Sequence, residues 1–130
     1  VRYAQTKLAN SVWTQALHSK LSASGSKVKA LCAAPGLAAT NLQVTTDIDG
    51  GMGSGTWFMS MAQSAEDGTM PLLQCCIGAA ESGEFIEPSK MGAMKGPAAV
   101  VPKLSAKETD TAAAAMLWQM SEKACGEWKL

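Results

Sequence analysis

The stretch Ser24-Gly25-Ser26-Lys27-Val28-Lys29-Ala30-Leu31-Cys32-Ala33-Ala34-Pro35 decides the fold. Ahead of it, residues 3–23 carry apolar side chains at helical spacing without Pro or Gly, which predicts a helix. Ser24-Gly25-Ser26 is a stop signal for that helix. Residues 28–34 form a nearly continuous apolar run, which is typical of a parallel strand buried on both faces. A helix, a tight turn and a parallel strand together indicate an α/β fold.

The rest of the chain alternates turns with short regular elements. Residues 40–55 are rich in Gly, Thr and Asp, which predicts a loop, with a short helix over 57–62. Residues 64–67 are typical of a helix cap with an acidic first turn. We expect a helix over 69–80, a strand over 83–88, an irregular segment through 102, and a helix over 111–124 capped by Thr109-Asp110. No second domain is evident, so residues 1–130 are interpreted as a single domain, with 41–62 as a flexible region.

Charge and composition argue against several kinds of partner. Eleven basic and eleven acidic side chains leave no net field to attract nucleic acid or an anionic membrane. The apolar runs are shorter than the roughly 20 residues that a membrane span requires, so we expect no span. Four cysteines without C-x-x-C spacing and one histidine make a metal site unexpected. They indicate thiols in a reducing compartment, cytoplasmic or organellar.

Tyr3 and Lys7 are the first candidates for chemistry. They stand four residues apart near the start of the first helix, so their side chains project from one face. A phenol holds its proton too firmly to exchange it readily near neutral pH, and a neighbouring ammonium favours the phenolate. The spacing therefore suits general acid/base catalysis, with Lys7 assisting Tyr3. The same spacing also arises by chance, as a surface lysine beside a half-buried tyrosine.

Two motifs together resemble the short-chain dehydrogenase/reductase superfamily. Tyr3-Ala4-Gln5-Thr6-Lys7-Leu8-Ala9-Asn10 is similar to the family's Tyr-x-x-x-Lys helix, and Pro35-Gly36 followed by Thr40 is similar to its Pro-Gly-x-x-x-Thr segment. Residues 67–73 and 83–88 resemble a helix and the last strand of retinol-dehydrogenase-like members. The resemblance covers most of the chain, and it is specific for the superfamily rather than for a subfamily.

The resemblance implies a role for each matching residue. Tyr3 would be the catalytic acid/base at the substrate carbonyl or alcohol, and Lys7 would favour its phenolate and bind the nicotinamide ribose. Further residues would bind the nicotinamide end of NAD or NADP: Pro35, Gly36, the backbone near Ala38, and the hydroxyl of Thr40. The cofactor would carry the hydride, and a small apolar alcohol or ketone would be the substrate.

The chain also departs from the family. A dinucleotide-binding sheet needs a glycine-rich turn after its first strand, and each βαβ unit takes about 30 residues. The resemblance therefore implies that residues 1–130 are a single partial domain, the C-terminal part of a doubly wound Rossmann-type parallel sheet with the N-terminal cofactor-binding half missing. Residues 41–62 would then cover the substrate. The family's catalytic serine would also fall before Val1. Residues 51–55 lack the spacing of the G-x-G-x-x-G fingerprint and are interpreted as an ordinary loop.

Two functions remain open. The first is an NAD(P)-dependent oxidoreductase that interconverts a carbonyl and an alcohol, of which this chain is a part expected to be inactive alone. The second is a non-catalytic subunit derived from the same superfamily, bound within a larger assembly because a half sheet exposes a strand edge and an apolar face. The resemblance implies a possible homo-oligomer through the first helix, and the second function implies a host protein complex. His18 is expected to be a solvated residue late in that helix. Five methionines would fill gaps or line an apolar substrate mouth: Met52, Met59, Met61, Met91 and Met94.

Overall fold

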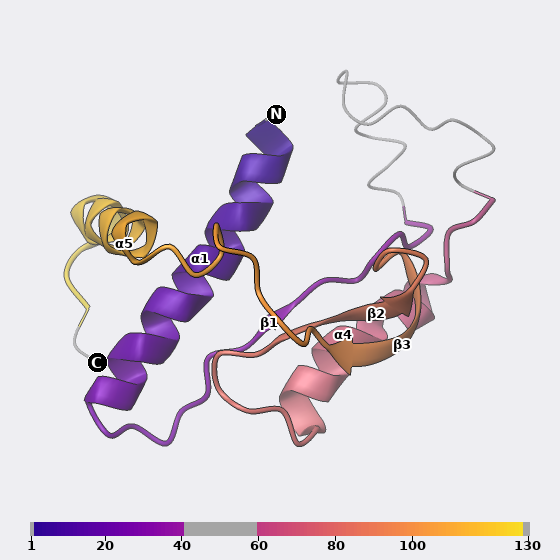
Figure 1. The fold of residues 1–130 in the computed structure, drawn as a ribbon, viewed down its shortest axis with the longest axis horizontal. Helices are drawn as coiled ribbons and strands as arrows, with labels where there is room; N and C mark the ends of the chain where they lie inside the picture. Colours follow the sequence, from indigo (N-terminus) through magenta and orange to yellow (C-terminus); the bar gives the residue numbers. More distant parts are fainter. Residues whose placement is uncertain (1, 41–59, 129–130) are drawn as a thin grey trace. The chain divides into compact units, whose positions relative to one another are not determined.

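The computed structural model describes residues 2–40 and 60–128. Its elements, labelled in Figure 1, are α1 (Arg2–Ala23), β1 (Cys32–Ala33), α4 (Ala65–Ile77), β2 (Phe85–Lys90), β3 (Lys95–Val100) and α5 (Thr111–Cys125). They form two compact units. The first comprises Val1–Cys32, Ala80–Phe85 and Val101–Leu130, and the second comprises Ala33–Ala79 and Ile86–Val100. The architecture is mixed α/β, as the sequence indicates.

Helix α1 ends where the sequence predicts. The Ser26 amide donates to the Leu21 carbonyl and the Gly25 amide donates to the Ser22 carbonyl. Gly25 has a φ of 68°, the left-handed conformation that a glycine adopts without steric cost. This pair of bonds is the Schellman motif, which satisfies carbonyls that the last helical turn would leave without donors.

Helix α5 begins at Asp110, whose carboxylate accepts hydrogen bonds from the Ala112 and Ala113 amides. This N-cap was predicted, and it supplies an acceptor for two of the orphan donors of the first turn. Within the first unit α5 packs against α1, as Figure 1 shows. The contact is centred on Trp118, which is only 5% exposed.

The sheet has three strands in the order β1-β2-β3. The Cys32 amide donates to the Glu84 carbonyl and the Ala34 amide to the Ile86 carbonyl, so the numbers rise together, as in a parallel pair. Strands β2 and β3 pair antiparallel as a hairpin, with a register irregularity between Pro88 and Lys90. The described sheet therefore holds one parallel and one antiparallel pair.

Two expectations about the strands were wrong. The run 28–34 forms a strand only at Cys32–Ala33, and Val28 is 65% exposed rather than buried. The segment through residue 102 is not irregular throughout, because Lys95–Val100 forms β3. Gly96 and Pro97 disfavour a central strand, but β3 lies at the edge of the sheet, where a proline is tolerated.

Helix α4 begins at the predicted cap, because the Ser64 hydroxyl accepts from the Asp67 amide at 3.0 Å. The helix starts earlier than residue 69 and ends at Ile77, where the Gly78 amide closes the last turn on the Gln74 carbonyl. Pro71 lies inside it and is buried. Within the second unit α4 packs against β3, while four large apolar side chains of the helix stay exposed: Met70, Leu72, Leu73 and Ile77.

Within residues 2–40 and 60–128, no helix combines the length and the apolar character that crossing a membrane requires. Most of the expected loop region 41–62 falls outside these residues, and so do Met52, Met59 and residues 51–55.

Candidate functional site

Tyr3 and Lys7 lie together on α1, as their spacing predicts. The Lys7 Nζ atom is 5.2 Å from the centroid of the Tyr3 ring. Tyr3 is 52% exposed, and Lys7 is exposed as well. The Thr6 hydroxyl donates to the Tyr3 carbonyl at 2.8 Å, so it is occupied within the helix. The structure therefore places the Lys7 ammonium near the ring of an exposed tyrosine.

The segment that contains the other predicted residues follows β1 in the second unit. Gly36 has a φ of 67°, and a Cβ atom at this position would lie 2.5 Å from the Met94 carbonyl oxygen and 2.8 Å from Pro88 Cγ. Pro35 beside it is exposed. The Leu37 amide donates to the same Met94 carbonyl at 2.7 Å. The β2–β3 turn therefore packs directly on this segment, and only glycine fits at position 36.

Ala38 and Thr40 differ in burial. Ala38 is 7% exposed and forms an isolated parallel bridge with Gln63. A Cβ atom at Gly68, in the first turn of α4, would lie 2.7 Å from Ala38 Cβ, so the helix approaches this backbone closely. Thr40 is exposed, at the end of the described range.

The predicted residues divide between the two units. Tyr3 and Lys7 belong to the first unit. Pro35, Gly36, Ala38 and Thr40 belong to the second. The structure brings Tyr3 and Lys7 together in the first unit, and the other four residues lie along one segment of the second.

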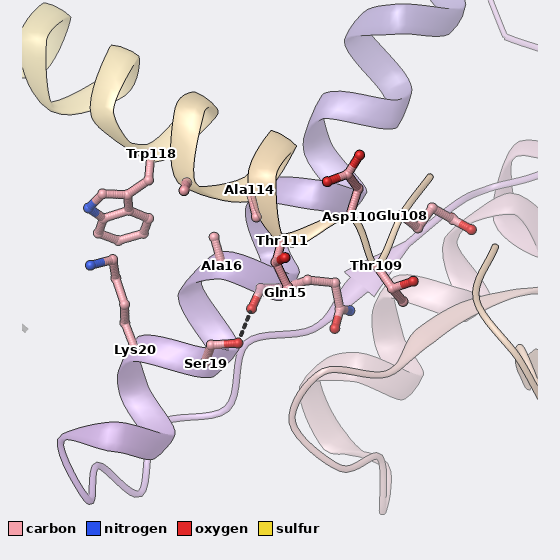
Figure 2. Close-up of a pocket in the computed structure, with 11 residues that line it drawn as sticks. Gln15, Ala16, Ser19, Lys20, Glu108, Thr109, Asp110, Thr111, Ala114 and Trp118 are labelled. Atoms are coloured by element: carbon pink, nitrogen blue, oxygen red, sulfur yellow. Dashed lines mark hydrogen bonds between the residues drawn. The ribbon is translucent and has the colours of Figure 1, made fainter. Parts of the chain in front are cut away.

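The first unit also contains a groove of about 320 Å³ along α1 and α5, shown in Figure 2. Its apolar wall is formed by Ala16, Ala114, Ala115 and Trp118. The groove includes neither Tyr3 nor Lys7. Its polar groups are largely engaged, since Asp110 caps α5, the Gln15 amide donates to the Gly83 carbonyl and the Ser19 hydroxyl donates to the Gln15 carbonyl. We therefore assign it no ligand.

Three tryptophans pack together beside this groove. Trp13 and Trp118 are stacked, and Trp128 meets both rings edge-on, with centroids 5.2 and 5.1 Å away. The Lys20 Nζ atom lies 4.7 Å from the centroid of the Trp118 ring, and Figure 2 shows its side chain reaching toward that ring. The indole N–H of Trp118 is buried without an acceptor among the described residues. The cluster is consequently an apolar anchor between two helices.

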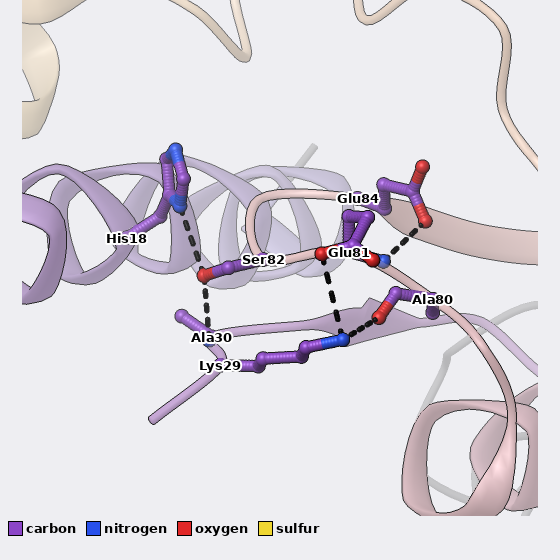
Figure 3. A network of polar contacts seen from close by, with 7 residues as sticks. All are labelled: His18, Lys29, Ala30, Ala80, Glu81, Ser82 and Glu84. Carbon is purple, nitrogen blue, oxygen red and sulfur yellow. Dashed lines mark hydrogen bonds and ion pairs between the residues drawn. The ribbon is translucent and has the colours of Figure 1, made fainter. Parts of the chain in front are cut away.

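His18 was expected to be solvated, but it is half-buried and tied to the segment before β2. Its Nδ1 atom is 2.9 Å from the Ser82 hydroxyl, which also accepts from the Ala30 amide at 3.0 Å, as Figure 3 shows. A Cβ atom at Gly83 would lie 3.0 Å from the imidazole ring. Because the hydroxyl is held from two sides, this pair fixes the chain path.

Lys29 completes that network. Its ammonium donates to the Ala80 carbonyl at 2.8 Å and lies 3.5 Å from the Glu81 carboxylate, as drawn in Figure 3. The two side chains are 45% and 75% exposed, so their ion pair contributes little. The Glu81 amide donates to the Glu84 carboxylate at 2.8 Å. These contacts order residues 80–84 rather than create a reactive site.

Glu108 connects the loop between β3 and α5 to helix α1 through hydrogen bonds. Its carboxylate accepts from the Ser105 amide at 2.8 Å and from the Ser11 hydroxyl at 3.1 Å. Burial alone would raise the pKa of Glu108, but the hydrogen bonds from Ser105 and Ser11 outweigh it and hold the pKa below its ordinary value. Sequence reasoning missed this residue, because the 97 positions between Glu108 and Ser11 hide the contact.

No group of His, Cys, Asp or Glu side chains in the described residues is arranged to hold a metal ion. Sequence reasoning also missed Gln63, which is hydrogen-bonded to Pro35, Leu37 and Ala39 of the Pro35–Thr40 segment. The Gln63 partners are backbone groups, which leave no mark in the sequence.

Comparison with known proteins gives a likeness of fold. The sequence matches no protein-family model and no curated protein. A solved structure of an uncharacterized protein from Mycobacterium paratuberculosis is similar, with 29% sequence identity and a TM-score of 0.65 over 93% of this chain. The chain spans only 37% of the length of that protein. This chain thus resembles one part of a longer protein to which no activity is attached.

Proposed function

We propose that this chain is part of a nicotinamide-dependent oxidoreductase of the short-chain dehydrogenase/reductase type. The observation that carries the proposal is the Tyr3–Lys7 pair, four residues apart on one helix face with Nζ 5.2 Å from the ring centroid. In this role Tyr3 would give its proton to a carbonyl oxygen, or take one from an alcohol, and Lys7 would be the cation beside it. The cofactor, when bound, supplies or accepts the hydride.

The Pro35–Thr40 segment supports the same proposal. Binding the nicotinamide end of a cofactor needs a protein backbone of fixed shape. Here the β2–β3 turn packs closely on Gly36, and Gly68 of α4 packs closely on Ala38. The Ala38 backbone and the Thr40 hydroxyl would bind the carboxamide or a nearby phosphate.

The proposed oxidoreductase function also implies a larger fold. The parallel β1–β2 pair would be one part of a doubly wound sheet, and its partner strands would lie outside residues 1–130. The similar structure, of which this chain spans 37%, is compatible with a longer protein. NAD and NADP are both retained as cofactor candidates, and a small apolar alcohol or ketone as substrate.

The experiment uses the protein in its full natural length. NADH and NADPH oxidation is measured with a panel of apolar ketones, in the wild type and in Tyr3→Phe. We expect Tyr3→Phe to lower kcat about 10²- to 10⁴-fold, because it removes the transferable proton, with the melting temperature unchanged. Gln5→Ala, an exposed position of the same turns, is the matched control. Equal turnover by Tyr3→Phe and wild type would refute the role of Tyr3, and a wild type without turnover would refute the proposal.

A second candidate is a non-catalytic subunit of a larger assembly. The observation that favours it is the set of exposed large apolar side chains on two helices: Met70, Leu72, Leu73 and Ile77 of α4, and Met116 and Met120 of α5. Each helix is described in its own unit, and several large apolar side chains exposed on one helix are often covered by a partner. The native mass from the source, with identification of co-purifying chains, separates the candidates. A mass near 13.5 kDa with bound partners favours the subunit, whereas a larger chain that turns over NAD(P)H favours the enzyme.

A further inference from the structure

Gln63 is a buried amide in the second unit, 8% exposed, immediately before the Ser64 cap of α4. Its backbone amide donates to the Leu37 carbonyl at 2.9 Å, and its carbonyl accepts from the Ala39 amide at 2.9 Å. These two bonds attach residue 63 to the Pro35–Thr40 segment as a single rung of parallel pairing. A single rung is a weak attachment, because ordinary strands share several.

The side chain of Gln63 adds two further bonds. Its Nε2 atom donates to the Pro35 carbonyl at 2.7 Å, and its Oε1 atom accepts from the Gly96 amide at 3.1 Å. The amide therefore bridges the turn after β1 to strand β3. Both interactions are with backbone groups, which are costly to bury without a partner.

Only an amide of this length satisfies both partners. A carboxylate keeps an acceptor for Gly96 but presents an oxygen to the Pro35 carbonyl, and an apolar side chain leaves both backbone groups without their bond. The burial of Gln63 is thus explained by what it fixes. Of the backbone groups from Pro35 to Ala39, Gln63 binds the carbonyls of residues 35 and 37 and the amide of residue 39.

We infer that Gln63 is a positioning residue, whose amide holds the Pro35–Thr40 segment in the shape that receives the nicotinamide end of the cofactor. This inference rests on the proposed function and names a residue that would control cofactor affinity without touching the reacting atoms. Gln63 would act through Pro35 and Gly36. Its loss should therefore affect cofactor binding more than the chemical step.

The test measures steady-state kinetics of the full-length protein with NADH and NADPH. We expect Gln63→Met, which keeps the length but removes the amide, to raise the cofactor KM about tenfold with kcat within about twofold. Gln63→Glu should raise it comparably, and it replaces Gln63→Met if that variant does not fold. Gln15→Met is the matched control: it removes a 2.7 Å amide bond to the Gly83 carbonyl in the other unit, and should leave KM unchanged.

A second readout follows the segment itself. In Gln63→Met, amide hydrogen exchange should be faster at Gly96, which loses its acceptor. It should also be faster at Ala39, although the acceptor of Ala39 is the backbone carbonyl of residue 63 and is retained. Exchange at Ala113 in α5 should be unchanged. A wild type that turns over NAD(P)H, with variant KM equal to that of the wild type, would overturn the inference. Unchanged exchange at Ala39 would overturn it too. Wild-type protein that binds no nicotinamide cofactor would instead refute the proposed function, and the exchange data would still decide whether Gln63 orders the segment.

Discussion

The indole ring of Trp118 stacks on that of Trp13, with centroids 5.6 Å apart and planes 13° from parallel. One ring comes from α5 and the other from α1, and Trp118 is the buried side chain of α5. Since aromatic burial dominates the energetics of small contacts, this stack is the main attachment of α5 in the first unit.

Replacing Trp118 should detach α5. We expect Trp118→Ala to lower the free energy of unfolding by about 3 kcal/mol, which is the usual cost of truncating a large buried aromatic side chain. Urea denaturation followed by circular dichroism measures it. Met120→Ala, at a residue 61% exposed on the same helix, should change stability by less than about 0.5 kcal/mol. Similar losses in the two variants would show that the stack is not the anchor.

Glycine at position 36 is required for two reasons that can be separated. Gly36 and Gly92 have φ values of 67° and 63°, but a Cβ atom meets the Met94 carbonyl at Gly36 and nothing within 4 Å at Gly92. Gly92→Ala should cost about 1 kcal/mol for the left-handed backbone alone. Gly36→Ala should cost at least about 1 kcal/mol more, because the hairpin turn must move. Thermal or urea denaturation measures both, and equal losses would contradict the packing of the turn on this segment.

Glu108 should make stability depend on pH. Its pKa is lowered in the folded state, so its stabilisation is present above the unfolded-state pKa and is lost as the pH falls through the folded-state value. We expect Glu108→Gln to be less stable than wild type by up to about 1 kcal/mol near neutral pH, and the difference to shrink as the pH falls through the lowered pKa of Glu108. Urea midpoints across this range measure it. Glu127→Gln removes an exposed carboxylate and should show no such trend; a constant difference for Glu108→Gln would contradict the assignment.

Local signals in the sequence predicted the end of α1 and the N-caps of α4 and α5, but neither the end of α4 nor the long-range pairing. Ser24-Gly25-Ser26 and the caps at Ser64 and Asp110 act within a few residues, and all three were confirmed. The shared face of Tyr3 and Lys7 was confirmed for the same reason, because helix geometry alone sets it.

Strand β3 was missed because Gly96 and Pro97 are typical of turns. A proline inside a strand is tolerated mainly at a sheet edge or a bulge, and both are properties of the whole fold. Gln63 was missed because its partners Pro35 and Gly96 are about 30 residues away and contribute backbone atoms. The burial of Gln63 depends on how distant segments pack around it, so the sequence near residue 63 does not predict it.

The approach of α4 to the Pro35–Thr40 segment can be tested by moving a methyl group. A Cβ atom at Gly68 would lie 2.7 Å from Ala38 Cβ, closer than two such atoms can pack. Gly68→Ala should therefore lower the free energy of unfolding by about 1–3 kcal/mol through overpacking, despite the higher helix propensity of alanine.

Removing the opposing methyl group should compensate. Ala38→Gly alone should cost about 0.5–1 kcal/mol, yet added to Gly68→Ala it should restore part of the lost stability. The coupling energy of this double-mutant cycle should exceed about 0.5 kcal/mol, because the two positions are in contact. Urea denaturation of the four proteins measures it. Additive losses would mean that Gly68 and Ala38 do not meet in solution, and the ordered shape of the Pro35–Thr40 segment would then need another cause.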